Sequence, residues 1–464
     1  MKPSPRLQKL HFIGIGGAGM SVLAEVLASW GFVISGSDGQ ESETLDRLRA
    51  LGMKAVSGHD ASHLGDPDAV VYSSAVPGSN PELAEARRRG LPLVKRAEML
   101  GEALRGKYAL AVAGTHGKTT TTTMLGRIWI EAGKEPTLLA GGTARGENLS
   151  ALAGKGEAVI VEADEFDRSF LSLRPAAAII GNIDSDHLDT YGSLDAIRDA
   201  FREFAEAMPF YGLVVANRDD AGVQAVLPRL TRRVATYGLQ DGAEYRAVDS
   251  QLAGQGMVFA LEQRGSLLGK IRLPVPGIHN VYNALAAAAL SLEEGIPFAA
   301  IQKALAGYPG VKRRLELRGT KAGVTFYDDY AHHPTEVSAA LKAARGLLPK
   351  TPDAGRLIAV FQPHLYSRTR QLHREFAAAF AACDELFVTR VYPSREQPIP
   401  GVEGDLIVTD ARADGMHADK VHYVEDIETL PGAVAARVRS GDLVLTMGAG
   451  DITYRCSAIM EAVR

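Results

Sequence analysis

The sequence predicts an α/β protein with several domains, because short apolar stretches alternate with helical patterns along most of its length. Two of these stretches enter glycine-rich turns that open helices, at residues 14–19 and 114–120, and the same alternation returns near residue 320. A chain of 464 residues is too long for one ordinary domain, so we expect about two to four.

The stretch that organises this prediction is Gly114-Thr115-His116-Gly117-Lys118-Thr119-Thr120. The apolar residues 108–113 before it predict a buried strand, and residues 119–132 after it predict a helix that ends at Gly133. A strand that enters a helix through Gly-Lys-Thr is typical of a phosphate-binding loop, because backbone N–H groups and the helix N-terminus face the anion.

Two side chains of this loop indicate nucleotide chemistry. Lys118 would add a positive charge beside the phosphates, and the Thr119 hydroxyl could ligate Mg²⁺. Val112 stands where the full Walker pattern has its first glycine, so the loop is a shortened version that begins at Gly114. We reject the alternative of a helix N-cap with a solvated lysine, because it leaves the strand and the second glycine unexplained.

A dinucleotide-type fingerprint lies near the start of the chain. A predicted strand over residues 10–15 enters Gly14-Ile15-Gly16-Gly17-Ala18-Gly19, and a helix and a second strand then lead to Ser37-Asp38. This is the G-x-G-x-x-G pattern in its strand–turn–helix setting, with an acid where a ribose contact would lie. Taken alone it indicates NAD or FAD. The alternative is a glycine turn that only packs a helix against a sheet.

Ser73-Ser74 end another predicted strand, residues 69–73, at the carboxyl end where open α/β sheets bind ligands. On local grounds a polar loop closed by Pro77 explains them equally well. Further strand–helix units continue to about Leu104.

Acidic residues follow two predicted strands of the central region. One strand ends in Glu162-Ala163-Asp164-Glu165, which resembles the acidic partner that holds Mg²⁺ opposite a phosphate loop. A second, residues 176–180, leads to Asp184-Ser185-Asp186-His187-Leu188-Asp189. Alone, these aspartates would be helix caps and the histidine a packed turn residue. Two acidic strand ends beside one phosphate loop favour a cation site instead.

The next polar residues are ambiguous from their local pattern. Residues 233–273 predict short strands, and Asn280 and Asn283 begin an alanine-rich helix that they could simply cap. Arg313-Arg314 could reach a γ-phosphate, although paired arginines are more often surface charge.

Three predicted strands of the last region end in chemically active residues. The strand over residues 324–327 ends in Asp328-Asp329-Tyr330-Ala331-His332-His333-Pro334. Another ends in Gln362-Pro363-His364-Leu365-Tyr366-Ser367-Arg368, and a third in Gly448-Ala449-Gly450-Asp451. Because α/β sheets place function at the carboxyl ends of their strands, the three together predict the wall of an active site.

Composition argues against several classes of protein. A net charge of −4 gives no electrostatic footprint for nucleic acid. Only Cys383 and Cys456 occur, which is too few for a disulfide framework and compatible with a reducing compartment. No apolar stretch approaches the roughly 20 residues of a membrane helix, and residues 1–9 lack the apolar core of a signal peptide. We therefore expect a soluble, cytoplasmic protein with no nucleic-acid or membrane partner.

Taken together, these residues resemble the Mur ligase family, in particular the member that adds L-alanine. The motifs that carry the resemblance lie at residues 11–20, 35–38, 114–120, 162–165, 186–189, 279–280, 313–314 and 328–334. The resemblance implies an α/β fold with three domains. These would be a Rossmann-like UDP-sugar-binding domain (1–106), a central ATPase domain with the phosphate loop (107–319) and a Rossmann-like amino-acid-binding domain (320–464).

The resemblance implies an ATP-dependent ligase that joins L-alanine to the lactyl carboxylate of UDP-N-acetylmuramate through an acyl phosphate. It would release ADP and phosphate, require Mg²⁺ and serve the synthesis of peptidoglycan precursors. The glycine-rich pocket would then bind the UDP diphosphate in place of NAD. The protein would be a monomer or a weak homodimer.

The resemblance also assigns residues to each ligand. Lys118, His187 and Arg313 would be catalytic. ATP would contact Gly114, Thr115, His116, Gly117, Lys118, Thr119, Thr120, Asn280, Arg313 and Asp328. The UDP-sugar would contact Gly14, Gly16, Gly17, Gly19, Ser37, Asp38, Ser73 and Ser74. The amino acid would contact Tyr330, His332, His364 and Arg368, and the metal would contact Thr119, Glu162 and His187.

Two departures from the family pattern limit these assignments. Related ligases carry a lysine, modified to a carbamate, shortly past the Asp-His motif, but residues 200–204 contain none. Leu365 stands where many relatives place an arginine, which leaves Arg368, or in competition Arg370, for the amino-acid carboxylate. His332 or His333 could deprotonate the incoming amine.

Three other functions stay open from the sequence. An NAD(P)-dependent oxidoreductase would explain residues 14–19 and Asp38, but not the Gly-Lys-Thr loop. A non-catalytic nucleotide switch would need that loop alone. A ligase that recycles whole murein peptides, or one that adds a different amino acid, is the third alternative.

Overall fold

The computed structural model describes residues 2–142, 144–145, 151–349, 351, 355–394 and 396–464. Its strands form three sheets of five, ten and six strands, flanked by helices, which confirms the predicted α/β class. The chain divides into two compact units. The first comprises residues 1–249, 259–271 and 282–308, and the second comprises residues 250–258, 272–281 and 309–464.

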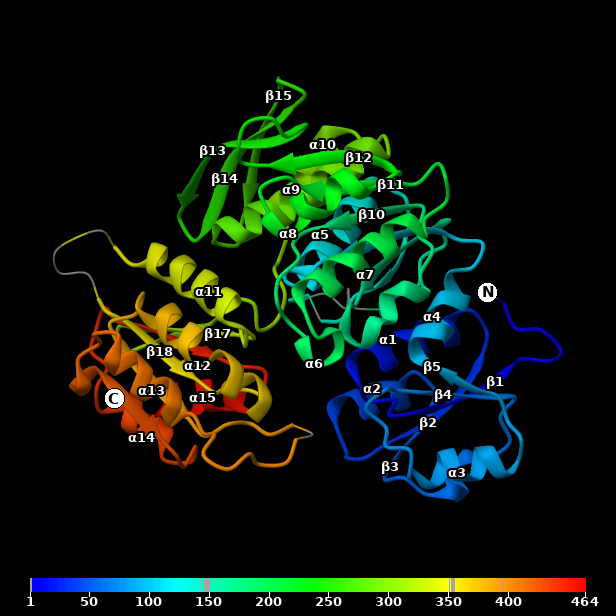
Figure 1. Ribbon diagram of the computed structural model, residues 1–464, viewed down its shortest axis with the longest axis horizontal. Helices are drawn as coiled ribbons and strands as arrows, with labels where there is room; N and C mark the ends of the chain where they lie inside the picture. The colour runs from blue at the N-terminus through cyan, green and yellow to red at the C-terminus, as the bar shows by residue number, and fades with distance from the viewer. Residues whose placement is uncertain (1, 143, 146–150, 350, 352–354, 395) are drawn as a thin grey trace. The chain divides into compact units, whose positions relative to one another are not determined.

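The first sheet is built from the N-terminal strand–helix units, drawn in blue in Figure 1. Its strands are β1 (Lys9–Ile13), β2 (Val33–Asp38), β3 (Lys54–Ser57), β4 (Ala69–Tyr72) and β5 (Leu93–Lys95). Its helices are α1 (Ala18–Ser29), α2 (Glu43–Ala50), η1 (Ala61–Leu64), α3 (Pro81–Arg88) and α4 (Arg96–Leu104). The strands are parallel in the order β3-β2-β1-β4-β5, so the order reverses between β1 and β4, the point at which such sheets bind ligands.

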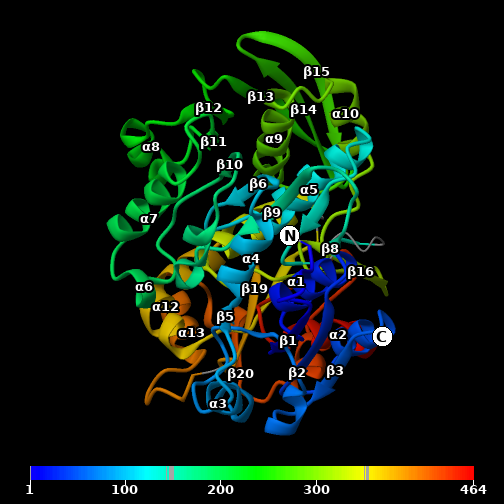
Figure 2. The ribbon, with the colours of Figure 1, turned by 90° about the vertical axis from the view of Figure 1, so that its right-hand side faces the viewer.

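The second sheet carries the phosphate loop. Its strands are β6 (Tyr108–Ala113), β7 (Thr137–Leu139), β8 (Ala151–Leu152), β9 (Ala158–Ala163), β10 (Ala177–Ile180), β11 (Leu213–Asn217), β12 (Arg233–Gly238), β13 (Tyr245–Ala253), β14 (Gly256–Gln263) and β15 (Ser266–Leu273). The helices are α5 (Lys118–Glu131), η2 (Phe166–Ser172), α6 (Leu188–Tyr191), α7 (Leu194–Glu206), α8 (Ala221–Val226), η3 (Leu227–Arg229), α9 (Ile278–Glu293) and α10 (Phe298–Ala306). Figure 2 shows α5 and α7 on opposite sides of the central strands.

Strand β6 lies between β9 and β10 and is parallel to both. Apart from the exposed Tyr108 at the start of β6 and the partly buried Glu162 of β9, the residues of these strands are buried, as expected for parallel strands covered by helices on both faces. Because the carboxyl ends of parallel strands share one edge, the acidic turns after β9 and β10 flank the loop after β6. The prediction that two acidic strand ends lie beside the phosphate loop is confirmed.

The third sheet lies in the second unit. Its strands are β16 (Glu316–Lys321), β17 (Val324–Asp329), β18 (Leu357–Phe361), β19 (Glu385–Thr389), β20 (Val421–Val424) and β21 (Leu443–Met447). The helices are α11 (Pro334–Leu347), α12 (Tyr366–Phe380), α13 (Asp405–Ala413), η4 (Ala418–Lys420), α14 (Leu430–Ala435) and α15 (Ile452–Ala462). The order is β16-β17-β21-β18-β19-β20, with β16 as the antiparallel edge strand. The three strands predicted to end in active residues, β17, β21 and β18, are therefore neighbours.

The structure corrects one predicted strand end. Strand β17 continues through Asp328 and Asp329, because these residues pair with Thr446 and Met447 of β21 and are buried. The third sheet begins at Glu316, where β16 pairs with β17. Among the described residues, no helix is long and apolar enough to cross a membrane. Both cysteines are buried and unbridged.

Candidate active site

The loop between β6 and α5 has two positions that favour glycine. Gly114 has a φ of +146° and Gly117 a φ of +78°. A Cβ at Gly117 would lie 2.6 Å from Asn283 Oδ1, and a Cβ at Gly114 would lie 3.2 Å from Asn182 N. Backbone conformation and close neighbours together explain both glycines of the shortened motif.

Lys118, the first residue of α5, folds back over this loop. Its Nζ donates to Gly114 O at 2.8 Å and to Thr115 O at 3.1 Å, and it lies 2.6 Å from Glu165 Oε2. Burial alone would lower the pKa of Lys118, but the carboxylates after β9, Glu165 foremost, outweigh burial and raise it above the ordinary value. The side chain is therefore a charged ammonium, as a phosphate-binding role requires.

Oxygen atoms gather next to Lys118 at the carboxyl end of β9. Thr119 Oγ1 donates to Glu162 and lies 3.1 and 3.0 Å from its two oxygens, and Gly141 N donates to Glu162 Oε2 at 2.7 Å. Burial raises the pKa of Glu162, an effect that Lys118 partly offsets. Hydroxyl and carboxylate oxygens are the ligands that Mg²⁺ prefers, so Thr119 and Glu162 fit the predicted metal site.

Glu165 belongs to the acidic stretch expected near Mg²⁺ but was not among the three residues assigned to the metal. Its Oε1 is buried, has no hydrogen-bond partner among the described residues and lies 3.9 Å from His187 Nε2. Burial raises the pKa of Glu165 to about 7. A buried, unsatisfied carboxylate oxygen is a group that a cation would stabilise, so Glu165 joins Glu162 as a candidate ligand.

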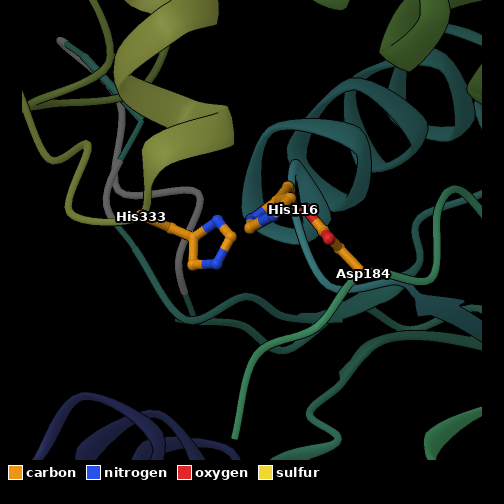
Figure 3. A group of neighbouring side chains, drawn as sticks. All are labelled: His116, Asp184 and His333. Atoms are coloured by element: carbon orange, nitrogen blue, oxygen red, sulfur yellow. Dashed lines mark hydrogen bonds and ion pairs between the residues drawn. The ribbon is translucent and has the colours of Figure 1, made fainter. Parts of the chain in front are cut away.

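The turn after β10 holds the phosphate loop in place. His116 N donates to Asn182 Oδ1 at 2.7 Å, Asn182 Nδ2 donates to His116 O at 3.0 Å, and Asp184 N donates to Thr115 Oγ1 at 2.9 Å. The ring Nε2 of His116 lies 3.2 Å from Asp184 Oδ2, and Figure 3 shows the two groups facing each other. Thr115 and His116, predicted to contact ATP, thus also fix the loop to the neighbouring strand end.

His187 lies further along the same turn, just before α6. Its φ of +57° is uncommon for a residue other than glycine. The ring packs edge-on against Phe166, with 5.1 Å between centroids, and Nδ1 lies 3.8 Å from Asp186 Oδ1. The Nε2 atom lies 3.9 Å from Glu165 Oε1, and the metal role of His187 stays a prediction.

The glycine-rich loop after β1 is held by the end of β2. Gly14 N donates to Ser37 O at 2.8 Å, and Gly16 N donates to Asp38 Oδ2 at 2.8 Å. The Ser37 side chain is fully buried and donates to Glu82 Oε1 at 2.7 Å. The Asp38 side chain therefore contacts the loop directly, at Gly16 N. Ser37, predicted to contact the UDP-sugar, instead holds the loop through its backbone oxygen, and its side chain is buried.

The remaining residues predicted for the UDP-sugar lie around the same point of the sheet. Gly17 immediately precedes α1, and Gly19 lies in its first turn. A Cβ at Gly14 would lie 3.5 Å from Ser73 Cβ, so the loops after β1 and β4 meet where the strand order reverses. Ser74 follows in the turn after β4.

In the second unit, three side chains predicted to bind the amino acid form one row. The His332 ring lies 5.2 Å from that of Tyr330 and 5.9 Å from that of His364. His364 in turn stacks on Tyr392 at 5.8 Å, which extends the row by a residue that the sequence did not indicate. The adjacency of β17, β21 and β18 brings these rings together.

Burial separates the two arginines of α12. Arg368 is 9% exposed, in the first turn of α12, whereas Arg370 is exposed on the surface. Leu365 just before the helix has a φ of +71°. The two arginines thus differ in burial, and the assignment of Arg368 to a ligand carboxylate stays a prediction.

Arg313 is held by groups at the carboxyl edge of the third sheet. Its guanidinium lies 4.8 Å from the Tyr330 ring centroid and donates to Gly448 O at 2.6 Å, and its Nε lies 3.6 Å from Asp328 Oδ2. Asp328 is fully buried and accepts hydrogen bonds from two threonine hydroxyls at 2.7 and 2.6 Å. Asp328, predicted to contact ATP, therefore positions Arg313 from within the sheet.

Three domain models of one protein family match successive regions of the chain. The Mur ligase family catalytic domain matches residues 9–108, the Mur ligase middle domain 112–291, and the Mur ligase glutamate ligase domain 313–450. The UDP-N-acetylmuramate–L-alanine ligase of Solidesulfovibrio magneticus is 47% identical over 461 residues, which cover 99% of each chain. The chain belongs to the Mur ligase family. The enzyme of the same name from Trichlorobacter lovleyi is 44% identical over 98% of this chain and 99% of its own.

Solved structures of Mur ligases share this fold. A UDP-N-acetylmuramate–alanine ligase from Thermotoga maritima superposes with a TM-score of 0.82 at 31% identity and covers 98% of each chain. A murein peptide ligase from Psychrobacter arcticus gives a TM-score of 0.73 at 25% identity over 98% of this chain and 99% of its own. The full-length matches confirm the predicted α/β fold of a Mur ligase.

The two asparagines at the start of α9 do not act as simple N-caps in this Mur ligase. Asn280 Nδ2 donates to Pro276 O at 2.7 Å and so fixes the turn before the helix. Asn283 Oδ1 accepts from Thr121 Oγ1 at 3.1 Å and borders Gly117 of the phosphate loop. Asn283 is thus a site residue that the sequence left unassigned, although its spacing of three from Asn280 was a usable signal.

Proposed function

We propose that this Mur ligase joins L-alanine to the lactyl carboxylate of UDP-N-acetylmuramate, with cleavage of ATP to ADP and phosphate, in the synthesis of peptidoglycan precursors. The observation that carries the proposal is the site formed by Lys118, Thr119 and Glu162. It lies in a chain that is 47% identical over 99% of its length to a UDP-N-acetylmuramate–L-alanine ligase. The site supports phosphoryl transfer, and the relatives support the acceptor and the amino acid.

In the first half-reaction, the lactyl carboxylate attacks the γ-phosphorus of ATP, the bond to the β-phosphate oxygen breaks and ADP leaves. Phosphoryl transfer depends mainly on positioning and neutralisation of charge. Lys118 supplies a buried cation, and Arg313 would supply a second. Thr119, Glu162 and His187 would hold Mg²⁺, and Glu165 is a further candidate ligand. The bound Mg²⁺ would offset the charge of the phosphates.

In the second half-reaction, the free amine of L-alanine attacks the acyl-phosphate carbonyl, and the tetrahedral species expels phosphate. Arg368 would hold the carboxylate of L-alanine through two parallel hydrogen bonds. The row of Tyr330, His332 and His364 would enclose the small side chain and exclude water, which would otherwise hydrolyse the acyl phosphate. His332, or the neighbouring His333, would take the ammonium proton.

The UDP-sugar would bind where the strand order of the first sheet reverses. The loop at residues 14–19 would contact the diphosphate, and Asp38 would contact the ribose. Ser73 and Ser74 would contact the UDP-sugar from the loop after β4. We also propose that the domains follow the limits 1–106, 107–319 and 320–464 approximately, and that the enzyme works in the cytoplasm as a monomer or weak homodimer. Its two unbridged cysteines suit a reducing compartment.

Amino-acid-dependent phosphate release tests the proposal. With ATP, Mg²⁺ and UDP-N-acetylmuramate present, L-alanine should give the fastest release, and omission of any one substrate should abolish it. Glycine and L-serine serve as near neighbours of the substrate, and D-alanine as a mirror-image control. Equal rates with and without UDP-N-acetylmuramate would contradict the proposed acceptor.

A murein tripeptide in place of L-alanine tests the rival function, which the likeness to the Psychrobacter arcticus structure motivates. We expect little phosphate release with the tripeptide, because the relatives from Solidesulfovibrio magneticus and Trichlorobacter lovleyi are named for L-alanine. A tripeptide rate above that of L-alanine would move the assignment to peptide recycling.

A further inference from the structure

Arg96, the first residue of α4, lies against the glycine-rich loop although nothing in the sequence pattern singles it out. A Cβ placed on Gly19 would lie 2.8 Å from Arg96 Nη1 and 3.4 Å from its Cζ. The guanidinium therefore occupies the space that a side chain at position 19 would fill. In this fingerprint the third glycine usually allows close packing of helix and strand, but here it makes room for a cation.

This placement is electrostatically unfavourable in the absence of an anion. Gly19 lies in the first turn of α1, a helix of twelve residues whose N-terminus carries partial positive charge. The guanidinium has five N–H donors but makes no hydrogen bond to any described residue. Its one ion pair is long, with 3.8 Å from Nη2 to Asp164 Oδ2, and its side chain is only 24% exposed.

Arg96 also connects the two binding regions of the first unit. Asp164 belongs to the acidic stretch after β9, and Arg96, Glu162 and Asp164 line the same small pocket. One face of the guanidinium thus lies over the glycine-rich loop, and its other end lies near the candidate metal ligands. An anion at the loop could bind Arg96 without any large movement of α4.

We propose that Arg96 binds a phosphate of the UDP-sugar diphosphate, and that Gly19 lacks a side chain to leave room for this guanidinium. The inference rests on the proposed function and adds a binding residue to it. Arginine suits the task because its planar, permanently charged fork donates two parallel hydrogen bonds to a phosphate. The long ion pair with Asp164 would keep the side chain beside the loop, and the phosphate would replace Asp164 as its partner.

The test uses the full-length protein with UDP as the probe, measured by calorimetry, and steady-state kinetics with UDP-N-acetylmuramate. Arg96→Gln should raise the Kd for UDP and the KM for UDP-N-acetylmuramate about 10- to 100-fold, the range for loss of charge-assisted hydrogen bonds. The KM for ATP and kcat should change less than about twofold, since the interaction is the same in ground and transition states. Arg96→Lys should recover part of the affinity.

Gly19→Ala provides an independent arm, because its methyl group would meet the flexible end of Arg96 and displace it without disturbing the backbone. It should raise the same two constants. Arg105→Gln is the matched control: this exposed arginine at the C-terminal end of α4 pairs with Glu102, and its loss should change neither constant. Thermal melts of all four variants report whether the fold is retained.

The outcomes separate the possible failures. If Arg96→Gln binds UDP as tightly as the parent, the inference is overturned, even if the KM for UDP-N-acetylmuramate rises, because the guanidinium would then meet the lactyl carboxylate or the sugar. A rise in the KM for ATP with unchanged UDP binding also overturns it and assigns Arg96 to the acidic stretch. A parent protein that binds neither UDP nor UDP-N-acetylmuramate overturns the proposed function itself.

Discussion

Lys118→Ala should reduce turnover strongly and leave the fold intact. In the structure, Nζ is the one part of the side chain with polar partners: two loop carbonyls and Glu165. Removal of a cation that stabilises charge at a phosphoryl-transfer centre should cost at least about 100-fold in kcat/KM. Loss of one partner from a buried ion pair typically costs about 3–5 kcal/mol of stability.

We expect a smaller stability loss here because of Glu165. Its pKa is raised to about 7 by burial, so near neutral pH this carboxyl takes up a proton readily once the lysine is absent. The variant then contains a neutral acid in place of an unpaired buried charge. Urea denaturation at pH 7 should therefore show a loss well below the usual range, while phosphate release with saturating substrates falls by two orders of magnitude or more.

A matched variant controls for loss of a lysine in general. Lys303 on α10 pairs with Glu131 of α5 and is 76% exposed, so Lys303→Ala should leave both activity and stability nearly unchanged. Near-normal turnover of Lys118→Ala at saturating ATP would refute the assignment of the phosphate loop. If Lys118→Ala lost activity only because it unfolds, its urea denaturation midpoint would be strongly lowered.

Three further predictions follow from the site. Glu162→Gln and His187→Asn should each raise the Mg²⁺ concentration for half-maximal activity about 10-fold or more. Asparagine replaces His187 because it tolerates a positive φ. Magnesium titration curves that overlay the curve of the parent protein would contradict the metal role. Arg368→Lys should raise the KM for L-alanine about 10-fold or more and leave that for ATP unchanged, and the same effect in Arg370→Lys instead would transfer the role. Calorimetry on the full chain should detect UDP but not NADH, and tight NADH binding would restore the oxidoreductase alternative.

Much of the site was accessible from the sequence because parallel sheets concentrate strand ends at one edge. Apolar stretches followed by Lys118, Glu162 and His187 identified the strands, and any arrangement that made β6, β9 and β10 neighbours would bring these residues together. The sheet order itself is a tertiary property. It became visible only in the pairing of β6 with β9 on one side and β10 on the other.

The residues that sequence reasoning placed less well are those whose environment depends on distant segments. Ser37 looks like a ligand contact from its position after the fingerprint, yet its hydroxyl bonds Glu82, far along the chain. Asp328 looks like a loop acid because buried carboxylates are rare, but two threonine hydroxyls satisfy it inside the sheet. Arg96 carries no motif, and only its proximity to Gly19 reveals it.

The central claim is that the lactyl carboxylate is activated by phosphorylation before L-alanine attacks. Transfer of oxygen-18 from a labelled lactyl carboxylate of UDP-N-acetylmuramate tests it most directly, with mass spectrometry of the phosphate released during L-alanine-dependent turnover. The account predicts that each molecule of product is accompanied by a phosphate carrying an oxygen-18 atom from the carboxylate. Formation of the alanyl product with unlabelled phosphate would contradict it.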